Sequence, residues 1–429
     1  MRQVSVLRNR NFLLFFGGQL ISRLGDGIYS LGLIWMMHVL TNSTLYMSFT
    51  LAAGIIPRII FGPVAGVFVD RWPKRLTLIG TDVVRFLLLG GLTALTFTHQ
   101  VSAILLIVFS FVLATMSTLF SPSYYVLQKH IVSADNLTQA YSWQSVSMNI
   151  AQIGGPAVAG LIIGSLGIGM GFAVDSATFL VSITALMLVR LDEPPIIRQQ
   201  LSVQGVFSDM SGGITALKRV PEVRALTPFM LGYNFLLAAL ENLLLVQFLA
   251  NVLHKGAFTV GIVMACSAIG ELVSSTALAV LRTKWTSSRG LVMNMIISAL
   301  SLSSIGFMRV AWAVGVLMFI AGFCMSIVNI SFFTGIQEAI PTDVLGRVWA
   351  ILGALFDSST PLAQIVFGSI AVIIPLGYMI STLGAVAALA GVGAFLHPAV
   401  RRLSLRASSE AETTGSDTDD NVSTESVLQ

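Results

Sequence analysis

Charged side chains in the middle of long apolar segments are the residues of this sequence best suited to chemistry. A charge at the centre of a lipid bilayer costs at least about 2.5 to 3.5 kcal/mol, so each one needs a partner, water or a function. A carboxyl group in such a place can bind and release a proton, and a nearby arginine changes how tightly that proton is held. We therefore predict that proton coupling or substrate contact involves the six residues near mid-segment, Arg23, Asp26, Arg58, Glu241, Glu271 and Asp357.

The six residues divide into two groups along the chain. Asp26 lies about fourteen residues, or about 21 Å at helical rise, into its apolar segment. Arg23, three positions earlier, shares its helical face, and Arg58 lies midway along the next segment, so these three predict a cluster of mixed sign. The other three are separate carboxylates with no basic neighbour in sequence. Both groups also have a purely structural interpretation, in which they only fix helix packing.

Three further charges in apolar segments are more typical of structural contacts. Asp82 and Arg85 are three residues apart near one end of their segment, a spacing at which helical side chains form pairs. Asp175 lies near the outer end of its own segment. We predict that all three hold helices together.

The composition places these charges in a membrane. Only 10% of the 429 residues are Asp, Glu, Lys or Arg, against about 25% in soluble domains, while 55% are apolar. A water-soluble surface cannot be built from that composition, and basic residues between spans explain the net charge of +4 better than nucleic acid does. Cys266 and Cys324 lie in separate apolar runs, which excludes a disulfide framework or a metal cluster of cysteines.

Twelve apolar runs are long enough to cross a bilayer as helices, since one span needs about 20 residues. We predict an all-α membrane protein of about twelve transmembrane helices in two pseudo-symmetric six-helix halves, residues 1–190 and 225–397. A central cytoplasmic loop, 191–224, joins the halves, and a disordered cytoplasmic tail, 398–429, follows them. The predicted spans are 12–38, 47–69, 76–98, 101–126, 140–166, 170–189, 226–251, 258–281, 290–308, 311–336, 346–372 and 374–397.

Basic residues indicate how the chain is oriented. Of the 24 Lys and Arg residues, 19 fall at the termini or in alternate loops on one side of the predicted bundle. Lys and Arg are retained on the cytoplasmic side, so both termini should be cytoplasmic in a plasma membrane. The first apolar segment has no small-residue cleavage site and is expected to be a retained helix.

The segment after the second span carries a family motif, Gly66-Val-Phe-Val-Asp70-Arg71-Trp-Pro-Lys74-Arg75. It resembles the signature loop of the major facilitator superfamily of transporters. The resemblance implies that the glycine lets helices approach and that the aspartate and the basic residues form a cytoplasmic latch. In that family the aspartate faces the positive N-terminal end of the eleventh span. Pro73 stands where the family usually has glycine.

Further motifs resemble the drug and siderophore exporter branch of that superfamily, which includes macrolide-efflux and enterobactin-export proteins. Gly155 and Pro156 resemble its antiporter motif, in which glycines and proline bend the fifth span and favour exchange. Ala151 and Ala159 stand where glycines are usual, and span 101–126 lacks the basic residue of many proton-coupled relatives. The other matching segments are 9–12, 120–122, 137–140, 154–160, 175–180 and 346–348.

These features favour an exporter that exchanges an amphipathic small molecule, such as a drug, a macrolide-like or a siderophore-like compound, for protons. We expect it to act as a monomer in the lipid bilayer, without cofactor, metal or nucleic acid. Aromatic and methionine side chains on inner spans would give the substrate an adaptable apolar wall. The candidates are Tyr29, Trp35, Met36, Tyr233, Phe235 and Phe356.

Three alternatives remain open from the residues. A metabolite importer or uniporter of the same fold would have the same helices. A non-transporting membrane sensor would have no reason to keep a latch and several mid-depth carboxylates. A membrane-embedded enzyme is disfavoured because the sequence has no Walker loop, no His-Glu-x-x-His helix and no Gly-x-Ser-x-Gly elbow.

Overall fold

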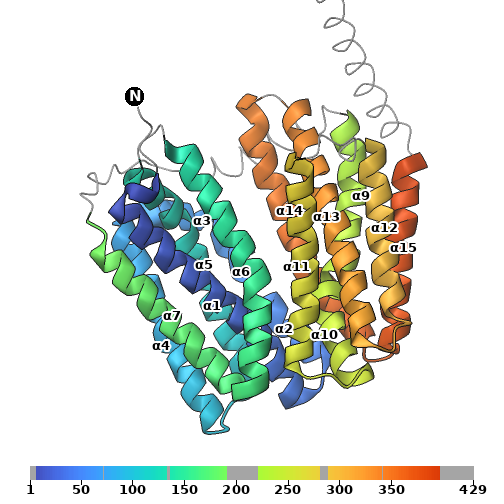
Figure 1. Ribbon diagram of the computed structural model, residues 1–429, viewed down its shortest axis with the longest axis horizontal. Helices are drawn as coiled ribbons and strands as arrows, with labels where there is room; N and C mark the ends of the chain where they lie inside the picture. Colours follow the sequence, from blue (N-terminus) through green and yellow to red (C-terminus); the bar gives the residue numbers. More distant parts are fainter. Residues whose placement is uncertain are drawn as a thin grey trace, which may run out of the picture.

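The part of the chain that the structure describes consists of helices and the short connections between them. The computed structural model describes residues 6–70, 72–132, 136–190, 221–280, 288–340 and 342–396, and their helices lie in two groups (Figure 1). In chain order the elements are η1 (Val6–Arg8), α1 (Arg10–Thr41), α2 (Thr44–Ala53), α3 (Ile56–Asp70), α4 (Lys74–Phe97), α5 (Ala103–Ile131), α6 (Leu137–Leu166), α7 (Ile168–Leu188), α9 (Pro221–Ala239), η3 (Leu240–Leu244), α10 (Leu245–Gln247), η4 (Phe248–Val252), α11 (Ala257–Val280), α12 (Ser288–Ile305), α13 (Ala311–Ala339), α14 (Thr342–Ile370) and α15 (Leu376–Leu396).

The predicted fold class, an all-α membrane protein of about twelve spans in two halves, is confirmed. Within the described ranges, ten helical segments are long and apolar enough to cross a membrane. The apolar part of α12 is shorter, Arg289–Ile305, and the 32-residue α1 carries the charges of Arg10, Arg23 and Asp26. Elements α1 to α7 form the N-terminal half, and α9 to α15 form the C-terminal half (Figure 1).

The second span is interrupted, which corrects the prediction of one continuous helix over 47–69. Helix α2 ends at Ala53 and α3 begins at Ile56. Pro57 explains the break, because proline has no N–H to donate and its ring clashes with the carbonyl four residues earlier, that of Ala53. The N–H of Gly54 closes α2 by donating to the carbonyl oxygens of Thr50 and Leu51 at 3.2 and 3.1 Å.

The seventh span begins earlier than predicted and contains two wide turns. Helix α9 starts at Pro221, so the last residues of the predicted loop 191–224 are helical; proline suits a first helical turn, where an N–H has no partner. Further along, η3 and η4 are π-helical, each a five-residue turn in which the backbone bonds reach one residue further than in an α-helix. The rest of the predicted loop and the predicted tail 398–429 lie outside the described residues.

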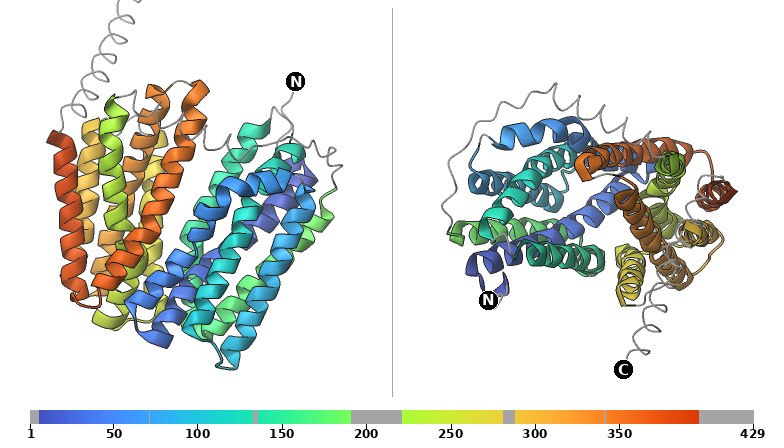
Figure 2. Two further views of the ribbon diagram at one scale, coloured as in Figure 1. Left: turned by 180° about the vertical axis from the view of Figure 1, so that it is seen from behind. Right: turned by 90° about the horizontal axis from the view of Figure 1, so that it is seen from above.

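The two halves meet at the end of the bundle opposite the start of α1 and the end of α15 (Figures 1 and 2). On one side of the interface α6 packs against α11, where a Cβ added to Gly160 would lie 3.1 Å from the Cα of Gly261. On the other side α14 packs against α2, where Gly368 lies against Ser48. Small residues let these backbones approach closely and hold this end of the bundle shut.

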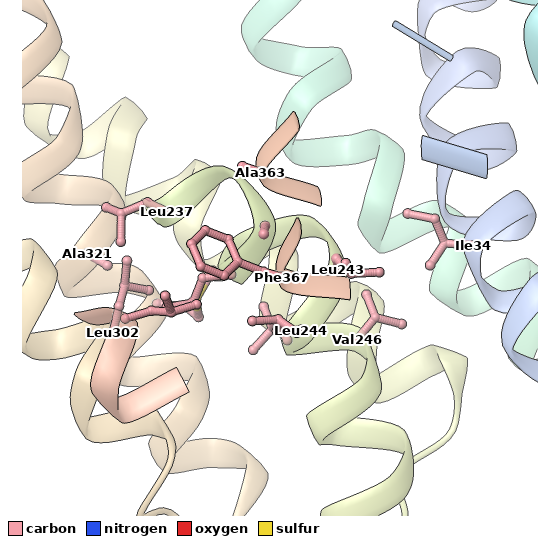
Figure 3. Close-up of a cluster of buried hydrophobic side chains, with 14 of the residues drawn as sticks. Ile34, Leu237, Leu243, Leu244, Val246, Leu302, Ala321, Ala363 and Phe367 are labelled. Atoms are coloured by element: carbon pink, nitrogen blue, oxygen red, sulfur yellow. The ribbon is translucent and has the colours of Figure 1, made fainter. Parts of the chain in front are cut away.

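A large buried apolar cluster continues across the same end and joins the halves. Ile34 of α1 projects toward Leu243 and Val246 of the seventh span (Figure 3). In the same region Gln247 donates a hydrogen bond to the sulfur of Met47 at 2.6 Å. Many large apolar side chains are exposed on the helices, as expected of surfaces in contact with lipid tails.

Candidate functional site

A cavity of about 950 Å³ lies between the two halves, comparable with the upper range of small-molecule sites. Its wall takes residues from α1 to α7 on one side and from η3, α11, α13 and α14 on the other. Much of the wall is aliphatic or carries methionine, including Leu31, Ile34, Leu113, Met264 and Met318. The charged residues of the wall are Asp26, Arg58, Arg85, Asp175, Glu241 and Glu271.

The cavity extends from the closed end of the bundle toward the end where the chain begins. On α5 the lining residues follow successive turns, from Ser110 through Ala114 and Ser117 to Ser121. On α3 they run from Arg58 through Gly62 to Ala65, toward the end of that helix. The cavity is therefore deep in the bundle at one end and reaches toward the side that holds the start of α1.

Asp26 faces this cavity from the middle of α1. It is the seventeenth of 32 residues in the helix, and its side chain is exposed to the cavity. Among the described residues, no ion pair or side-chain hydrogen bond to its carboxylate is found. Arg85 and Arg23 are the cations whose fields act on it.

Arg23 is directed away from Asp26 toward α5 and α6. Its guanidinium donates a hydrogen bond to the Ser147 hydroxyl at 3.2 Å and lies 5.0 Å from the ring centre of Tyr124. Arg23 is not among the residues that line the cavity. It therefore contributes positive charge near Asp26 without a direct contact.

Arg58 pairs with the other half of the molecule. Its guanidinium contacts the carboxylate of Asp357 on α14 at 2.6 Å, with 59% and 36% of the two side chains exposed. The sequence predicts a cluster of Arg58 with Arg23 and Asp26, but the ion-pair partner of Arg58 is Asp357 on α14. Its partner is 299 residues away in the chain, which explains why no basic neighbour of Asp357 is visible in the sequence.

Asp82 and Arg85 form the predicted pair within α4, at 3.5 Å and almost fully buried. The Ser182 hydroxyl donates to the other oxygen of Asp82 at 2.6 Å. The Arg85 guanidinium is held between the rings of Phe120 and Phe179, 4.8 and 5.5 Å from their centres. Arg85 also lines the cavity. Its place near one end of the predicted span did not indicate this position.

Asp175 also lies deeper than its place in the sequence indicated. It is the eighth residue of α7, about 10 Å along that helix, where it is fully buried and contributes to the cavity wall. Its carboxylate packs against Gly25, beside Asp26. In the sequence, Asp175 is recognisable only as a lone charge in an apolar span. The sequence does not show that Gly25 of α1 lies opposite this carboxylate.

Glu241 and Glu271 bring two carboxylates from the C-terminal half to the cavity wall. Glu241 belongs to the π-helical turn η3, and Glu271 lies on α11. The side-chain amide of Gln152, from α6 of the other half, donates to Glu271 at 2.9 Å. Neither carboxylate has a basic ion-pair partner among the described residues.

Of the six aromatic and methionine candidates for the wall, Tyr29 lines the cavity. Met36 and Tyr233 are buried in the apolar core, and the others pack against that core, because most such side chains in a bundle fill the space between helices. The remaining candidates are Trp35, Phe235 and Phe356. Within the described residues there is no group of His, Cys, Asp and Glu placed to hold a metal ion.

The predicted latch is described only in part. Arg71 lies outside the described residues, and so does the side chain of Asp70, although α3 includes Gly66 and ends at Asp70. Lys74 donates to the carbonyl oxygen of Trp72 at 3.3 Å. Arg75 donates to the last carbonyl oxygens of α7, those of Leu186 and Met187, at 2.8 and 2.6 Å.

Gly155 and Pro156, the predicted antiporter-like bend, lie next to Asp26. Pro156 is inside α6 and lines the cavity. A Cβ added to Gly155 would lie 3.0 Å from the Cα of Gly27 on α1, so two glycines permit this helix crossing. The contact fixes α6 beside the segment of α1 that carries Asp26.

Comparison with known proteins places the chain in one family. Residues 2–426 match the family model described as Transmembrane secretion effector. The chain is 24% identical over 400 residues to the multidrug efflux pump Tap of Mycolicibacterium fortuitum, which covers 92% of this chain and 97% of that protein. It is 22% identical over 365 residues to macrolide efflux protein A of Streptococcus pyogenes, 82% and 87% of the two chains. The solved nucleoside transporter NupG has the same fold, with a TM-score of 0.68 at 14% identity over 90% of this chain and 99% of that one.

Proposed function

Because the chain belongs to the major facilitator superfamily, in its family of transmembrane secretion effectors, we propose that it exports an amphipathic small molecule in exchange for protons. Its relatives are transporters, so it is a multi-pass membrane transporter and not an enzyme. The relatives' names mention multidrug and macrolide efflux, which supports a drug-like substrate. The observation that carries the proposal is Asp26, an ionisable group exposed in the central cavity and free of ion pairs within the described residues.

In the proposed cycle the cavity opens alternately to the two sides of the membrane. In the structure the halves are in contact at the end opposite the start of α1. With both termini in the cytoplasm of a plasma membrane, as the basic residues favour, the substrate enters from the cytoplasm. The halves then rock about their interface and open the other side. Proton binding at Asp26 from outside and release inside drives this cycle, and we propose that the protein acts as a monomer.

The charges of the wall favour a substrate that combines apolar surface with positive charge. Glu241 and Glu271 offer acceptors and negative charge from one half, and Met264 and Met318 offer soft apolar contacts beside them. Methionine surfaces adapt to substrates of different shape, as export of several drugs requires. Arg58 and Asp357 neutralise each other and connect the halves across the cavity.

The motif at the end of α3 controls on which side of the membrane the cavity is open. We assign Gly66, Asp70, Arg71, Lys74 and Arg75 to a latch that closes the cytoplasmic side and releases it as the halves rock. The observed bonds of Arg75 to the end of α7 anchor this loop to its own half. Gly155 and Pro156 shape the wall next to Asp26 and favour exchange of substrate for proton over uniport.

Transport by everted membrane vesicles tests the proposal. An imposed pH gradient, acid inside, should drive uptake of a macrolide and of a cationic dye, and a protonophore should stop it. Asp26→Asn should abolish gradient-driven uptake but leave downhill exchange of substrate intact, because only the proton site is lost. Asp26→Glu, which keeps a carboxyl group, is the matched control.

Two outcomes would contradict the proposal at different points. Uptake by the wild type that is indifferent to the protonophore would remove proton coupling. Gradient-driven uptake by Asp26→Asn equal to that of the wild type would remove Asp26 from the mechanism and leave export standing.

A further inference from the structure

We propose that Asp175 is a second proton carrier, which shares one proton with Asp26 across Gly25. The inference rests on the proposed exchange of substrate for protons and adds a residue to it. Asp26 is exposed toward the cavity, and Asp175 lies behind it in the helix packing. The same proton can then bind to the carboxyl group of Asp26 at the cavity or to that of Asp175 behind it.

The surroundings of the Asp175 carboxylate leave it incompletely satisfied. The side chain is fully buried, at 0% exposure. One oxygen, Oδ1, accepts a hydrogen bond from the Thr178 hydroxyl at 3.2 Å and lies against Gly25. The other oxygen, Oδ2, is buried and has no hydrogen-bond partner among the described residues. An ionised carboxylate in this position would lack the contacts that normally compensate burial, so the site favours a bound proton.

The charges around Asp175 cannot all be neutralised without such a proton. Helix α1 brings Asp26 and the phenol of Tyr29, and Arg23 of the same helix acts on Asp26. Helix α4 brings Arg85, which is paired with Asp82. The third neighbour, α6, has no Asp, Glu, Lys, Arg or His in residues 137–166. Three carboxyl groups therefore share two arginines, and one of these, Arg85, is already paired with Asp82. One proton restores neutrality, and Asp26 and Asp175 are the candidates to hold it because neither has an ion pair among the described residues.

Gly25 makes the sharing possible. A Cβ at this position would collide with the carboxylate of Asp175 and with the side chain of Thr178. Glycine thus lets α7 place Asp175 directly beside the turn of α1 that carries Asp26. In the transfer, the O–H bond of the Asp26 carboxyl group breaks and an O–H bond forms on Asp175, so the proton moves and no other reactant is needed.

The test compares Asp175→Asn with the wild type in proteoliposomes that contain a pH-sensitive dye and a macrolide. Asn keeps the shape and the bond from Thr178 but cannot carry a proton. We expect loss of gradient-driven accumulation and a flattened dependence of transport on pH, with downhill exchange retained. The double variant Asp26→Asn with Asp175→Asn should be no worse than either single variant, because the two groups hold one proton.

Ser176→Ala is the matched control, since Ser176 is the next residue of α7 and its hydroxyl donates to the Phe86 carbonyl oxygen on α4 at 3.1 Å. Its pH profile should equal that of the wild type. An unchanged pH profile in Asp175→Asn, or losses that add up in the double variant, would overturn the proposal. A wild type without any pH-driven accumulation would instead contradict the proposed exchange itself.

An infrared measurement decides the matter if Asp175→Asn does not fold. The purified wild type should show the carbonyl band of a buried protonated carboxyl group at neutral pH, and Gly25→Ala should shift or remove that band by displacing Asp175. Absence of such a band in the wild type would overturn the inference.

Discussion

The two halves present their charges to the cavity in different ways. In the N-terminal half Asp82, Arg85 and Asp175 are enclosed by packed helices, and Asp26 alone among the acidic residues of that network is exposed to the cavity. In the C-terminal half Glu241 lies on the cavity wall, and Asp357 is met by an arginine from the opposite half. Buried charges depend strongly on one another because water does not screen them, whereas exposed charges interact weakly.

From this difference we infer that the two halves have different functions. Charges that are buried together in a low-dielectric interior interact strongly, so proton binding at one of them depends on the positions of the others. Carboxylates that face a wet cavity are available to a cationic group that enters it. We therefore interpret the N-terminal half as the site of proton exchange and the C-terminal half as the part that recognises positive charge on the substrate.

The largest effect is expected from removing the buried arginine of the N-terminal half. Arg85→Met would leave Asp82 at 0% exposure without its cation. Breaking a buried ion pair from one side costs about 3 to 5 kcal/mol, because the remaining charge is left uncompensated. Thermal unfolding of the purified protein in detergent should show this loss. Arg85→Lys, which keeps the charge, should lose less, and wild-type stability in Arg85→Met would mean that the network is not tightly coupled.

The helices were predictable because each depends on a local pattern. Runs of about 20 apolar residues show the spans, and charges within such runs show that a polar interior exists. The interruption of the second span has a local signal as well, because Pro57 lacks the N–H that a continuous helix needs. The π-helical turn that carries Glu241 was not predictable, because no residue in Leu240–Leu244 requires a wider turn.

The site was predictable as a set of residues but not as a set of pairs. Asp26, Arg58, Glu241 and Glu271 all line the cavity, as expected of charges at mid-depth. The ion-pair partner of Arg58 depends on how the two halves pack against each other. The spacing of residues in the sequence does not show this packing. The approach of Asp175 to α1 depends on Gly25, whose role is apparent only when the facing helix is known.

A smaller effect is expected from a carboxylate of the C-terminal half. Glu271→Gln keeps the side-chain shape and an oxygen that can accept from Gln152, but it removes the charge. Loss of one charge interaction in a hydrated cavity should weaken binding of a cationic dye about tenfold, or about 1.4 kcal/mol. Fluorescence titration with the dye and with a neutral analogue measures the difference. Equal weakening for both ligands would indicate a change of shape and contradict charge recognition.

The smallest effect is expected from the ion pair that joins the halves. Arg58 and Asp357 keep 59% and 36% of their side chains exposed, so a double-mutant cycle of Arg58→Met and Asp357→Asn should give a coupling energy below about 1 kcal/mol. The cycle is measured by unfolding of the four proteins in detergent. A contact between the halves has to break whenever the cavity changes sides, and a weak pair can do so without adding much to the barrier. A coupling energy as large as that of a buried pair would mean that water does not reach Arg58 and Asp357, and the contrast between the buried charges of the N-terminal half and this exposed pair would then fail.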